Sequence, residues 1–319
     1  MQVKAIHLGF IIAMAVAASG HAETPLPDDG FVDVPGGRIA FRTFGEGDGT
    51  PLLVIHGGPG GTSCMYPSTL QGIAEDRPVI TYDQLGSGNS DRMTNMEDQA
   101  VVPRFVDEVE AIRNELGLDE IHLAGHSWGG AVAIEYLLSA EPEGVQSVTF
   151  IGPLIGTDRW LKDANTLVSE LSTSDQAAIE TAIKSGDYST PAFQTANDHF
   201  MAEFLSRGPQ ARNELPECAN SPGGNSALYE YMWGPSEFVS TGTLQVFDRT
   251  DDLSQISVPT LFIAGEYDEA RPATMKEFQK QVDGSVVKII PDAGHLVNVD
   301  QTKAFNKAVS EFLSSVDKQ

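Results

Sequence analysis

The chain has 319 residues, of which 41% are hydrophobic and 20% are charged, and its formal net charge is −25. This composition supplies a sizeable core and excludes a disordered chain, and the length suits one large domain or one domain with an insertion. The acidity argues against nucleic acids and anionic membrane surfaces as partners, because both repel a negatively charged protein.

The N-terminal residues indicate a secretory signal peptide. Lys4 precedes an apolar run over residues 8–18, and small residues follow as far as Ala22. The run is too short to span a bilayer comfortably, and the small residues are typical of a signal-peptidase cleavage site. We therefore predict that residues 1–22 are removed and that the protein is secreted or periplasmic; the alternative is an uncleaved membrane anchor. No later segment is apolar for long enough to span a membrane, so we expect no stable membrane association.

Cys64 and Cys218 are the only cysteines of the chain. An oxidising compartment permits a disulfide between them, but the sequence leaves open whether the bond forms. Neither cysteine belongs to a C-x-x-C pair, so we expect no zinc site.

The first half of the chain after the signal peptide alternates strands with helices. A β-hairpin is predicted over residues 31–45, and two buried-type strands follow, each running into a glycine-rich loop. Apolar residues at helical spacing then predict a helix that ends at Gly117. Such alternation is typical of a doubly wound, mostly parallel sheet, which binds ligands at the carboxyl ends of its strands. The predicted strands are residues 51–55, 79–82, 121–124 and 145–151, the glycine loops are 56–61 and 83–88, and the helices are 103–117 and 131–138.

The alternation stops near Leu154 and resumes near Val258. The residues between them predict amphipathic helices over 160–171, 174–185 and 192–206, followed by a loop with several prolines. Beyond them, strands are predicted over 258–264 and 286–290, and helices over 273–282 and 301–316. We therefore predict an α/β core of residues 23–154 and 248–319, with a mainly helical cap, residues 155–247, inserted over the strand ends.

The most informative motif is Gly-His-Ser-Trp-Gly at residues 125–129. It follows a predicted strand and opens a predicted helix, which is the context of a nucleophile elbow. In an elbow the serine occupies a sharp, strained turn that only glycine-sized neighbours allow, and its hydroxyl projects above the sheet beside a helix N-terminus. Ser127 is therefore the candidate nucleophile.

A serine hydroxyl needs a base, and that base needs an orienting acid. In hydrolases built around such an elbow, the acid and then the histidine follow the serine along the chain. His295 lies in the loop after the last predicted strand and is the candidate base. Three carboxylates past the strand 258–264 compete as the acid, namely Glu266, Asp268 and Glu269. We favour Asp268 because its short side chain can reach the imidazole; Glu266 is second, and Glu269 is expected to be solvated or to begin a helix.

Acyl transfer also needs backbone N–H groups that stabilise the developing oxyanion. The N–H of Trp128 lies directly after the candidate nucleophile. The glycine loop at residues 56–60, His-Gly-Gly-Pro-Gly, can supply a second N–H from Gly58, because glycines expose the amide and let the loop fold back.

Taken together, these motifs resemble the prolyl aminopeptidase (proline iminopeptidase) family of α/β-hydrolase serine peptidases. The resemblance spans nearly the whole chain after the signal peptide, and its sharpest parts are residues 56–60 and 125–130. Residues 82–84, 265–268 and 294–295 also match. The resemblance implies an α/β-hydrolase fold with a helical cap, a triad of Ser127, Asp268 and His295, and release of an N-terminal residue, often proline, from short peptides. Leu85 and Asn89 depart from it, because arginines are frequent at both positions, and this weakens any expectation of strict proline preference.

The resemblance also implies that glutamates of the cap bind the free α-ammonium of the substrate. The segment Tyr-Met-Trp-Gly-Pro-Ser-Glu-Phe at residues 231–238 is similar to the one that carries such a glutamate, which points to Glu237. The second should lie upstream, where Glu203 matches best by position. Trp233 would help to build an apolar pocket for the first side chain, although an aromatic residue there is equally expected as packing between cap and core.

We therefore expect a serine aminopeptidase that needs no metal or cofactor and acts on short peptides or amino-acid amides with a free N-terminus. The nearest alternative is an amidase or esterase of the same fold that acts on small amides or esters. A catalytically inactive binding protein on the same scaffold is disfavoured, because all three candidate triad residues are present.

Overall fold

The computed structural model describes residues 26–140, 142–208, 215–219 and 221–318. The predicted signal peptide lies outside these residues. None of the helices in the described part of the chain is long and apolar enough to cross a membrane.

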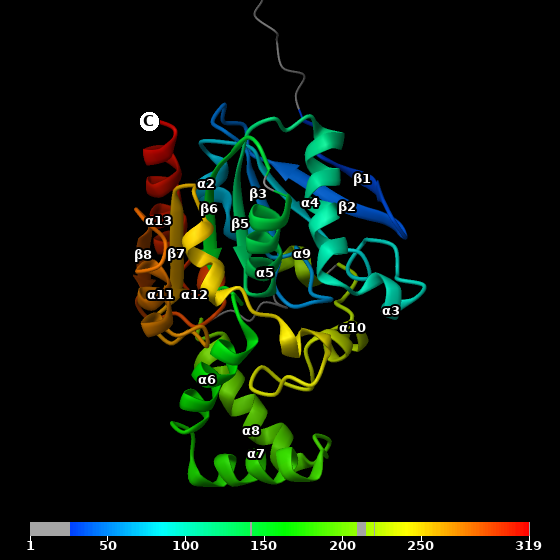
Figure 1. The fold of residues 1–319 in the computed structure, drawn as a ribbon, viewed down its shortest axis with the longest axis vertical. Coiled ribbons are helices and arrows are strands. Elements are labelled where there is room, and N and C mark those ends of the chain that lie inside the picture. Colours follow the sequence, from blue (N-terminus) through cyan, green and yellow to red (C-terminus); the bar gives the residue numbers. More distant parts are fainter. Residues whose placement is uncertain (1–25, 141, 209–214, 220, 319) are drawn as a thin grey trace, which may run out of the picture.

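A single eight-stranded sheet forms the centre of the molecule, in the order β1-β2-β4-β3-β5-β6-β7-β8 (Figure 1). The pairs β1–β2 and β2–β4 are antiparallel, and every other pair is parallel. This arrangement confirms the predicted doubly wound, mostly parallel sheet. The strands are β1 Asp29–Val34, β2 Gly37–Phe44, β3 Leu52–Ile55, β4 Val79–Tyr82, β5 Ile121–His126, β6 Val145–Ile151, β7 Thr260–Gly265 and β8 Val286–Ile290.

Helices cover both faces of the sheet, which explains why β3, β4, β5 and β7 are buried along their whole length. On one face, Phe105 of α4 and Ile134 of α5 belong to a large apolar cluster that continues into the inserted segment. On the other, Ile73 of α2 packs with Phe305 and Leu313 of α13. The core helices are α1 Tyr66–Thr69, α2 Gln71–Ala74, α3 Met96–Gln99, α4 Val102–Leu116, α5 Trp128–Glu135, α11 Pro272–Gln279, α12 Val297–Asp300 and α13 Thr302–Val316.

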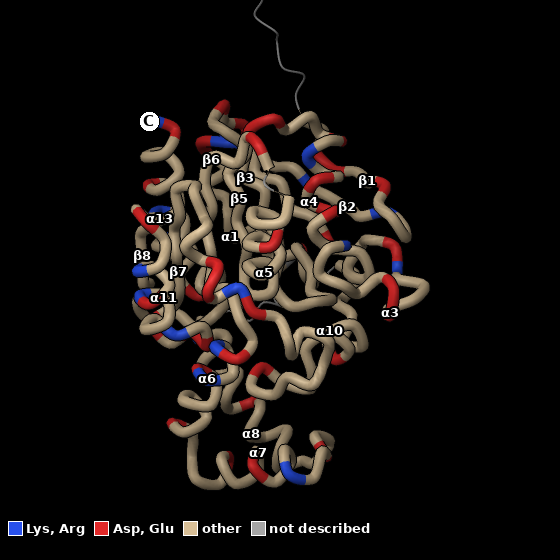
Figure 2. The backbone as a smooth tube through the Cα atoms, viewed as in Figure 1, with Lys and Arg blue, Asp and Glu red and all other residues tan. Residues whose placement is uncertain are grey.

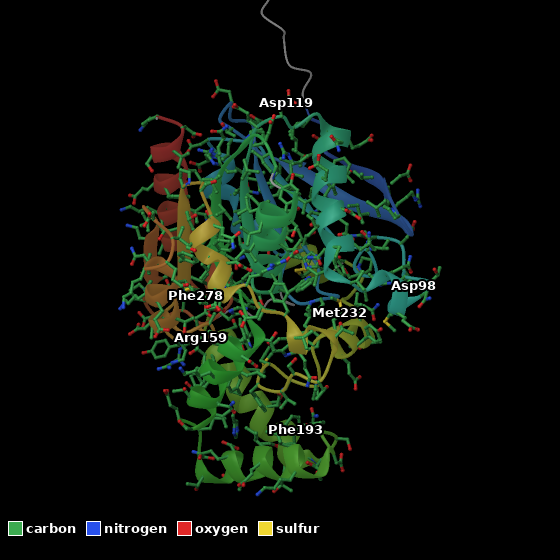
Figure 3. All side chains as sticks on the ribbon, in the orientation of Figure 1. Asp98, Asp119, Arg159, Phe193, Met232 and Phe278 are labelled. Carbon is green, nitrogen blue, oxygen red and sulfur yellow. A yellow bond between two sulfur atoms is a disulfide. The ribbon has the colours of Figure 1, made fainter. Side chains whose placement is uncertain are left out.

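Residues 155–247, the predicted cap, lie between β6 and β7 in the chain, and the helices over residues 157–200 lie below the carboxyl ends of the parallel strands in Figure 1. The large apolar cluster extends into the cap as far as Phe193, at the end remote from the sheet, which packs edge-on against Phe238 with ring centroids 6.0 Å apart (Figure 3). The cap holds α6 Thr157–Val168, α7 Thr173–Ser185, α8 Pro191–Phe200, the π-helical turn Met201–Leu205, α9 Pro216–Ala219, α10 Ser226–Met232 and the 3-10 turn Thr243–Val246.

A disulfide joins Cys64, which follows the first glycine loop, to Cys218 of α9, 154 residues further along. The sequence left this bond open, because two cysteines so far apart meet only if the cap folds back over the core. The bond ties α9 of the cap to the segment that directly follows the loop carrying Gly58. Asp and Glu outnumber Lys and Arg in the sequence, and Figure 2 shows the acidic positions distributed along the backbone of both core and cap.

Candidate active site

Ser127 occupies the sharp turn between β5 and α5. Its φ of 55° and ψ of −121° are rare for a residue with a side chain, and Asp292 is the only other non-glycine residue with positive φ in the described chain. The turn is possible because its neighbours are glycines: a Cβ on Gly125 would collide with the carbonyl of Gly129, and one on Gly129 with that of Ile55. The local sequence thus accounts for the sharp turn at Ser127, which is half-buried.

His295 lies in the loop after β8, and Asp268 lies in the loop after β7. The Nδ1 atom of His295 is 2.7 Å from Oδ1 of Asp268, and both residues are almost completely buried. Asp268 is itself held by the backbone N–H of Ala270, at 2.8 Å. Because a carboxylate can only accept, His295 donates from Nδ1 and presents Nε2 as the atom able to take a proton.

Burial disfavours the protonated form of His295. The charge of Asp268, its hydrogen bond and the charges of Glu237 and Asp300 together outweigh this effect. The pKa of His295 is therefore raised above its ordinary value. Such a histidine is a stronger base than an isolated imidazole.

The first glycine loop lies against the elbow. A Cβ on Gly57 would come within 2.8 Å of the Ser127 Cβ, and Gly58 has a φ of 63° that favours glycine. Gly58 and Trp128 both line the cavity into which Ser127 and His295 open. The structure therefore brings the two candidate oxyanion donors and two of the candidate triad residues to one cavity.

This cavity has a volume of about 460 Å³ and lies between the strand ends and the cap. Its walls are mainly apolar, and its charged or titratable groups are few. The apolar lining includes Met65, Leu154, Trp160, Trp233, Leu244 and Leu296, and the polar lining includes Ser127, Tyr229, Glu237 and His295. An apolar pocket with a few convergent polar groups is the usual form of a small-molecule site.

Glu237 lines the cavity, as expected of a substrate-binding residue. The Tyr229 hydroxyl donates a hydrogen bond of 2.6 Å to its Oε1. Burial raises the pKa of Glu237, although the bond from Tyr229 opposes the shift. Trp233 lines the same cavity and donates its indole N–H to the carbonyl of Ser236.

Glu203 does not reach this cavity. Its side chain is 58% exposed and pairs with Arg207, four residues further on, at 2.6 Å. The carboxylate near Glu237 is instead Glu269. The prediction that Glu269 is solvated is wrong, because the residue is fully buried. Its Oε1 lies 3.6 Å from Nε2 of His295. Neither of its oxygens has a hydrogen-bond partner among the described residues. The sequence signal that could have placed Glu269 in the site was its position next to Asp268. Both residues follow β7, and the site lies at the carboxyl ends of the parallel strands.

Burial, and then the neighbouring charge of Glu237, raises the pKa of Glu269 well above its ordinary value. The third candidate acid, Glu266, lies apart from His295, where it accepts from the N–H of Asp292 at 3.2 Å. No group of three His, Cys, Asp or Glu side chains in the described part of the chain could hold a metal ion.

The fold and this site define a serine hydrolase of the α/β-hydrolase class. Residues 50–302 match the family model for the alpha/beta hydrolase fold. A proline iminopeptidase of Heyndrickxia coagulans is 37% identical over 289 residues, which cover 90% of this chain and 99% of that protein.

Two crystal structures are also similar. That of proline iminopeptidase from Mycobacterium smegmatis has a TM-score of 0.80 at 28% identity, over 91% of this chain and 98% of that chain. That of VinJ has a TM-score of 0.82 at 27% identity, over 92% of this chain and 100% of that chain. The chain therefore belongs to the proline iminopeptidase family of α/β-hydrolases, as its motifs predict, and is a prolyl aminopeptidase-like serine hydrolase.

Proposed function

We propose that this protein is an exported serine aminopeptidase that releases one N-terminal residue, proline or another small apolar residue, from short peptides. The observation that carries the proposal is the position of Glu269. A buried carboxylate without a hydrogen-bond partner is costly, and it lies 3.6 Å from the atom that would act as the base. A cation bound there would remove that cost.

The free α-ammonium of a peptide is a cation of suitable size and position. In the first residue of a peptide, the α-nitrogen and the carbonyl carbon are bonded to the same Cα and lie about 2.5 Å apart. A group that recognises the ammonium must therefore lie next to the base that serves the carbonyl, as Glu269 does. Glu237, held by Tyr229, supplies a second carboxylate and is the one of the two that lines the cavity. Burial raises the pKa of both glutamates, and a bound ammonium would favour the ionised form of each.

The reaction follows from the arrangement of the other residues. His295 Nε2 takes the proton of the Ser127 hydroxyl as its Oγ bonds to the carbonyl carbon, and Asp268 stabilises the resulting imidazolium. The N–H groups of Gly58 and Trp128 bind the oxyanion. His295 then gives the proton to the departing nitrogen of the second residue. Water, activated by His295, hydrolyses the ester on Ser127 and releases the first residue.

The apolar cavity walls suit a small apolar first side chain such as that of proline. Leu154, Trp160, Trp233 and Leu244 supply these walls. Most of the binding free energy of such a side chain comes from the apolar area that it buries, at about 25 cal/mol per Å².

The carboxylate pair provides the decisive test of substrate class. We expect Glu269→Gln and Glu237→Gln each to lower kcat/KM for a prolyl-arylamide by about 100-fold, because each leaves the bound ammonium with one charge partner fewer in a buried site. Turnover of p-nitrophenyl acetate, which has no ammonium, should be retained. Steady-state kinetics on the two substrates measure the difference.

Glu203→Gln is the matched control, since it makes the same chemical change on an exposed side chain outside the cavity, and both activities should stay within about twofold of the unmodified enzyme. Equal cleavage of N-acetylprolyl and prolyl arylamides by the unmodified enzyme would instead indicate the amidase or esterase alternative.

Export rests on the N-terminal sequence and gains support from the disulfide, because disulfides persist mainly in oxidising compartments. Cells that produce the full chain should release a protein that begins at Glu23 and contains no free thiol. N-terminal sequencing and thiol titration under denaturing conditions check both points. A chain that keeps residues 1–22 and stays in the cytoplasm would contradict the proposal.

A further inference from the structure

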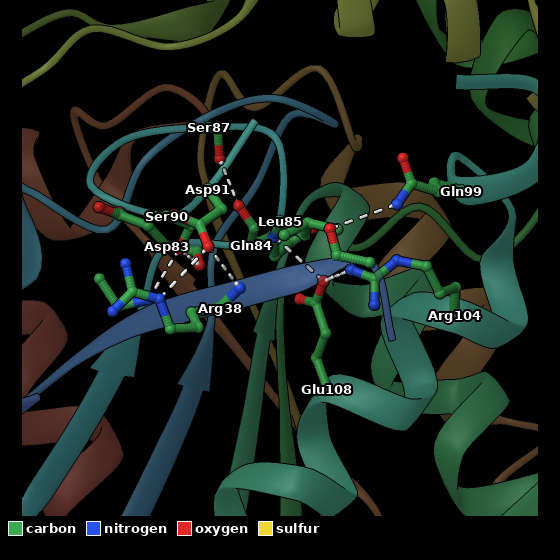
Figure 4. A network of polar contacts seen from close by, with 12 residues as sticks. Arg38, Asp83, Gln84, Leu85, Ser87, Ser90, Asp91, Gln99, Arg104 and Glu108 are labelled. Atoms are coloured by element: carbon green, nitrogen blue, oxygen red, sulfur yellow. Dashed lines mark hydrogen bonds and ion pairs between the residues drawn. The ribbon is translucent and has the colours of Figure 1, made fainter. Parts of the chain in front are cut away.

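The side chain of Gln84 is a buried amide that lies outside the cavity. It contacts both the elbow and the first glycine loop, which line the cavity. Gln84 follows β4 at the start of the second glycine loop, and it is completely buried. Figure 4 shows it in this loop, beside Leu85 and Ser87. Gln84 is absent from the residues that line the cavity, so any effect on catalysis must pass through other residues.

The side chain of Gln84 joins the elbow to the first glycine loop. Its Oε1 accepts from the indole Nε1–H of Trp128 at 2.8 Å, and its Nε2 donates to the carbonyl of His56 at 3.0 Å. An indole can only donate and a carbonyl can only accept, so the two partners determine which way the amide points. An amide offers a donor and an acceptor in this fork at every pH, whereas a carboxylic acid does so only while it is protonated.

A second chain of hydrogen bonds runs from Gln84 to the predicted oxyanion donor of the glycine loop. The Gln84 backbone N–H donates to Nε2 of His56 at 3.0 Å, which leaves the His56 proton on Nδ1. That Nδ1–H donates to the carbonyl of Gly57 at 3.0 Å. The Gly57 carbonyl and the Gly58 N–H belong to one planar peptide and point in opposite directions. Holding the carbonyl therefore aims the Gly58 N–H.

The loop that carries Gln84 is itself well supported. The Leu85 N–H donates to Oε1 of Glu108 at 3.0 Å, and Glu108 forms a buried ion pair with Arg104 on the same helix, α4 (Figure 4). The Ser87 hydroxyl donates to the Gln84 carbonyl at 3.0 Å. These contacts hold the backbone at Gln84 in place, as a positioning residue requires.

We propose that Gln84 is a positioning residue that holds the His56–Gly58 segment and Trp128 at one separation, so that their two N–H groups converge on the same oxyanion. The inference rests on the acyl transfer to Ser127 in the proposed function, but not on the free amine of the substrate. Loss of the Gln84 amide should therefore affect the transition state more than substrate binding.

Gln84→Met tests the inference, because methionine keeps the length of the side chain and removes both hydrogen bonds. We expect kcat for a prolyl-arylamide to fall about 10- to 100-fold, with KM within about threefold, since loss of one oxyanion donor costs 10²–10³ in kcat and misalignment costs less. The rate of Ser127 labelling by a fluorophosphonate and kcat for p-nitrophenyl acetate should fall in parallel. Gln99→Met, which removes an amide from the nearby α3, should leave all three rates within about twofold.

Gln84→Glu supplies a second, nearly isosteric test that does not depend on tolerance of methionine. A protonated glutamic acid can donate to His56 and accept from Trp128, whereas the carboxylate offers no donor to His56. The kcat of this variant, divided by that of the unmodified enzyme at the same pH, should rise as the pH falls from 8 to 6. A structural role alone would lower the melting temperature without this pH-dependent rescue.

A folded Gln84→Met variant with unchanged kcat and labelling rate would overturn the inference, as would a pH-independent ratio for Gln84→Glu. Two further outcomes would count against the proposed function, and both differ from the results that would overturn the inference on Gln84. If the substrate class is wrong, the unmodified enzyme cleaves acetylated substrates while the Gln84 effect on the ester persists. If the serine mechanism is wrong, the fluorophosphonate does not label the unmodified enzyme at all.

Discussion

Ser127→Ala is expected to lower kcat for a prolyl-arylamide by about 10⁵-fold or more, with little change in KM, because it removes the nucleophile and leaves the cavity walls intact. Alanine can take the backbone conformation of the elbow at the same cost as serine, so the variant should fold normally. Steady-state kinetics measure the loss, and circular dichroism checks the fold.

Labelling by a fluorophosphonate supplies an independent readout for Ser127. The unmodified enzyme should carry one label per chain, and Ser127→Ala should carry none. The Ser127→Ala preparation is then treated with the fluorophosphonate. Turnover that remains above about 1% of the original after this treatment would exclude Ser127 as the nucleophile.

The second large effect is expected from Asp268→Asn, which should lower kcat by about 10⁴-fold at neutral pH. An asparagine can turn its NH₂ group toward Nδ1 of His295, which then accepts, and the ring proton moves to Nε2. In that tautomer Nε2 cannot take the Ser127 proton. Glu266→Gln is the matched control, because it neutralises a carboxylate of the same loop that lies apart from His295, and its kcat should stay within about twofold.

Asp268→Asn should also change the pH profile. The charge of Asp268 is the largest contribution that raises the pKa of His295, and the base is active only when neutral. Activity of the unmodified enzyme should therefore rise with pH through a pKa above the ordinary value of histidine. Removing the charge lowers this pKa, so the acidic limb of kcat/KM for Asp268→Asn should shift to lower pH. A profile with an unshifted acidic limb would show that Asp268 is not the partner of His295.

The sheet could be predicted because its strands are local patterns. Short apolar runs such as residues 52–55 and 79–82 are buried on both faces, and each ends in glycines where the chain must turn sharply. The cap was harder to predict. Its long helices α6, α7 and α8 have amphipathic sequences, but α9 lies in the proline-containing loop that we predicted, and no element was predicted over α10. They are only four and seven residues long, and α10 begins where the Asn225 side chain accepts from the Leu228 N–H. A helix of two turns leaves too little periodicity to detect.

Some residues of the candidate site could likewise be predicted from the sequence, and others could not. Ser127, Asp268 and His295 each follow a strand, and the carboxyl ends of parallel strands meet at one edge, so order along the chain was enough to propose them together. The positions of Glu203 and Glu269 could not be derived like this. The direction of a carboxylate on the cap or on a loop depends on how these segments pack. The chain has 45 Asp and Glu residues, so many other carboxylates could have been chosen.

The sequence by itself determined the fold class, the elbow and the order of the candidate triad, because each depends on residues that are neighbours in the chain or on one sheet edge. Only the tertiary structure decided which carboxylates approach His295, that Cys64 and Cys218 join, and that Gln84 links two loops. These are contacts between segments far apart in the sequence, and their distances are set by packing of the cap and loops on the core rather than by any local pattern.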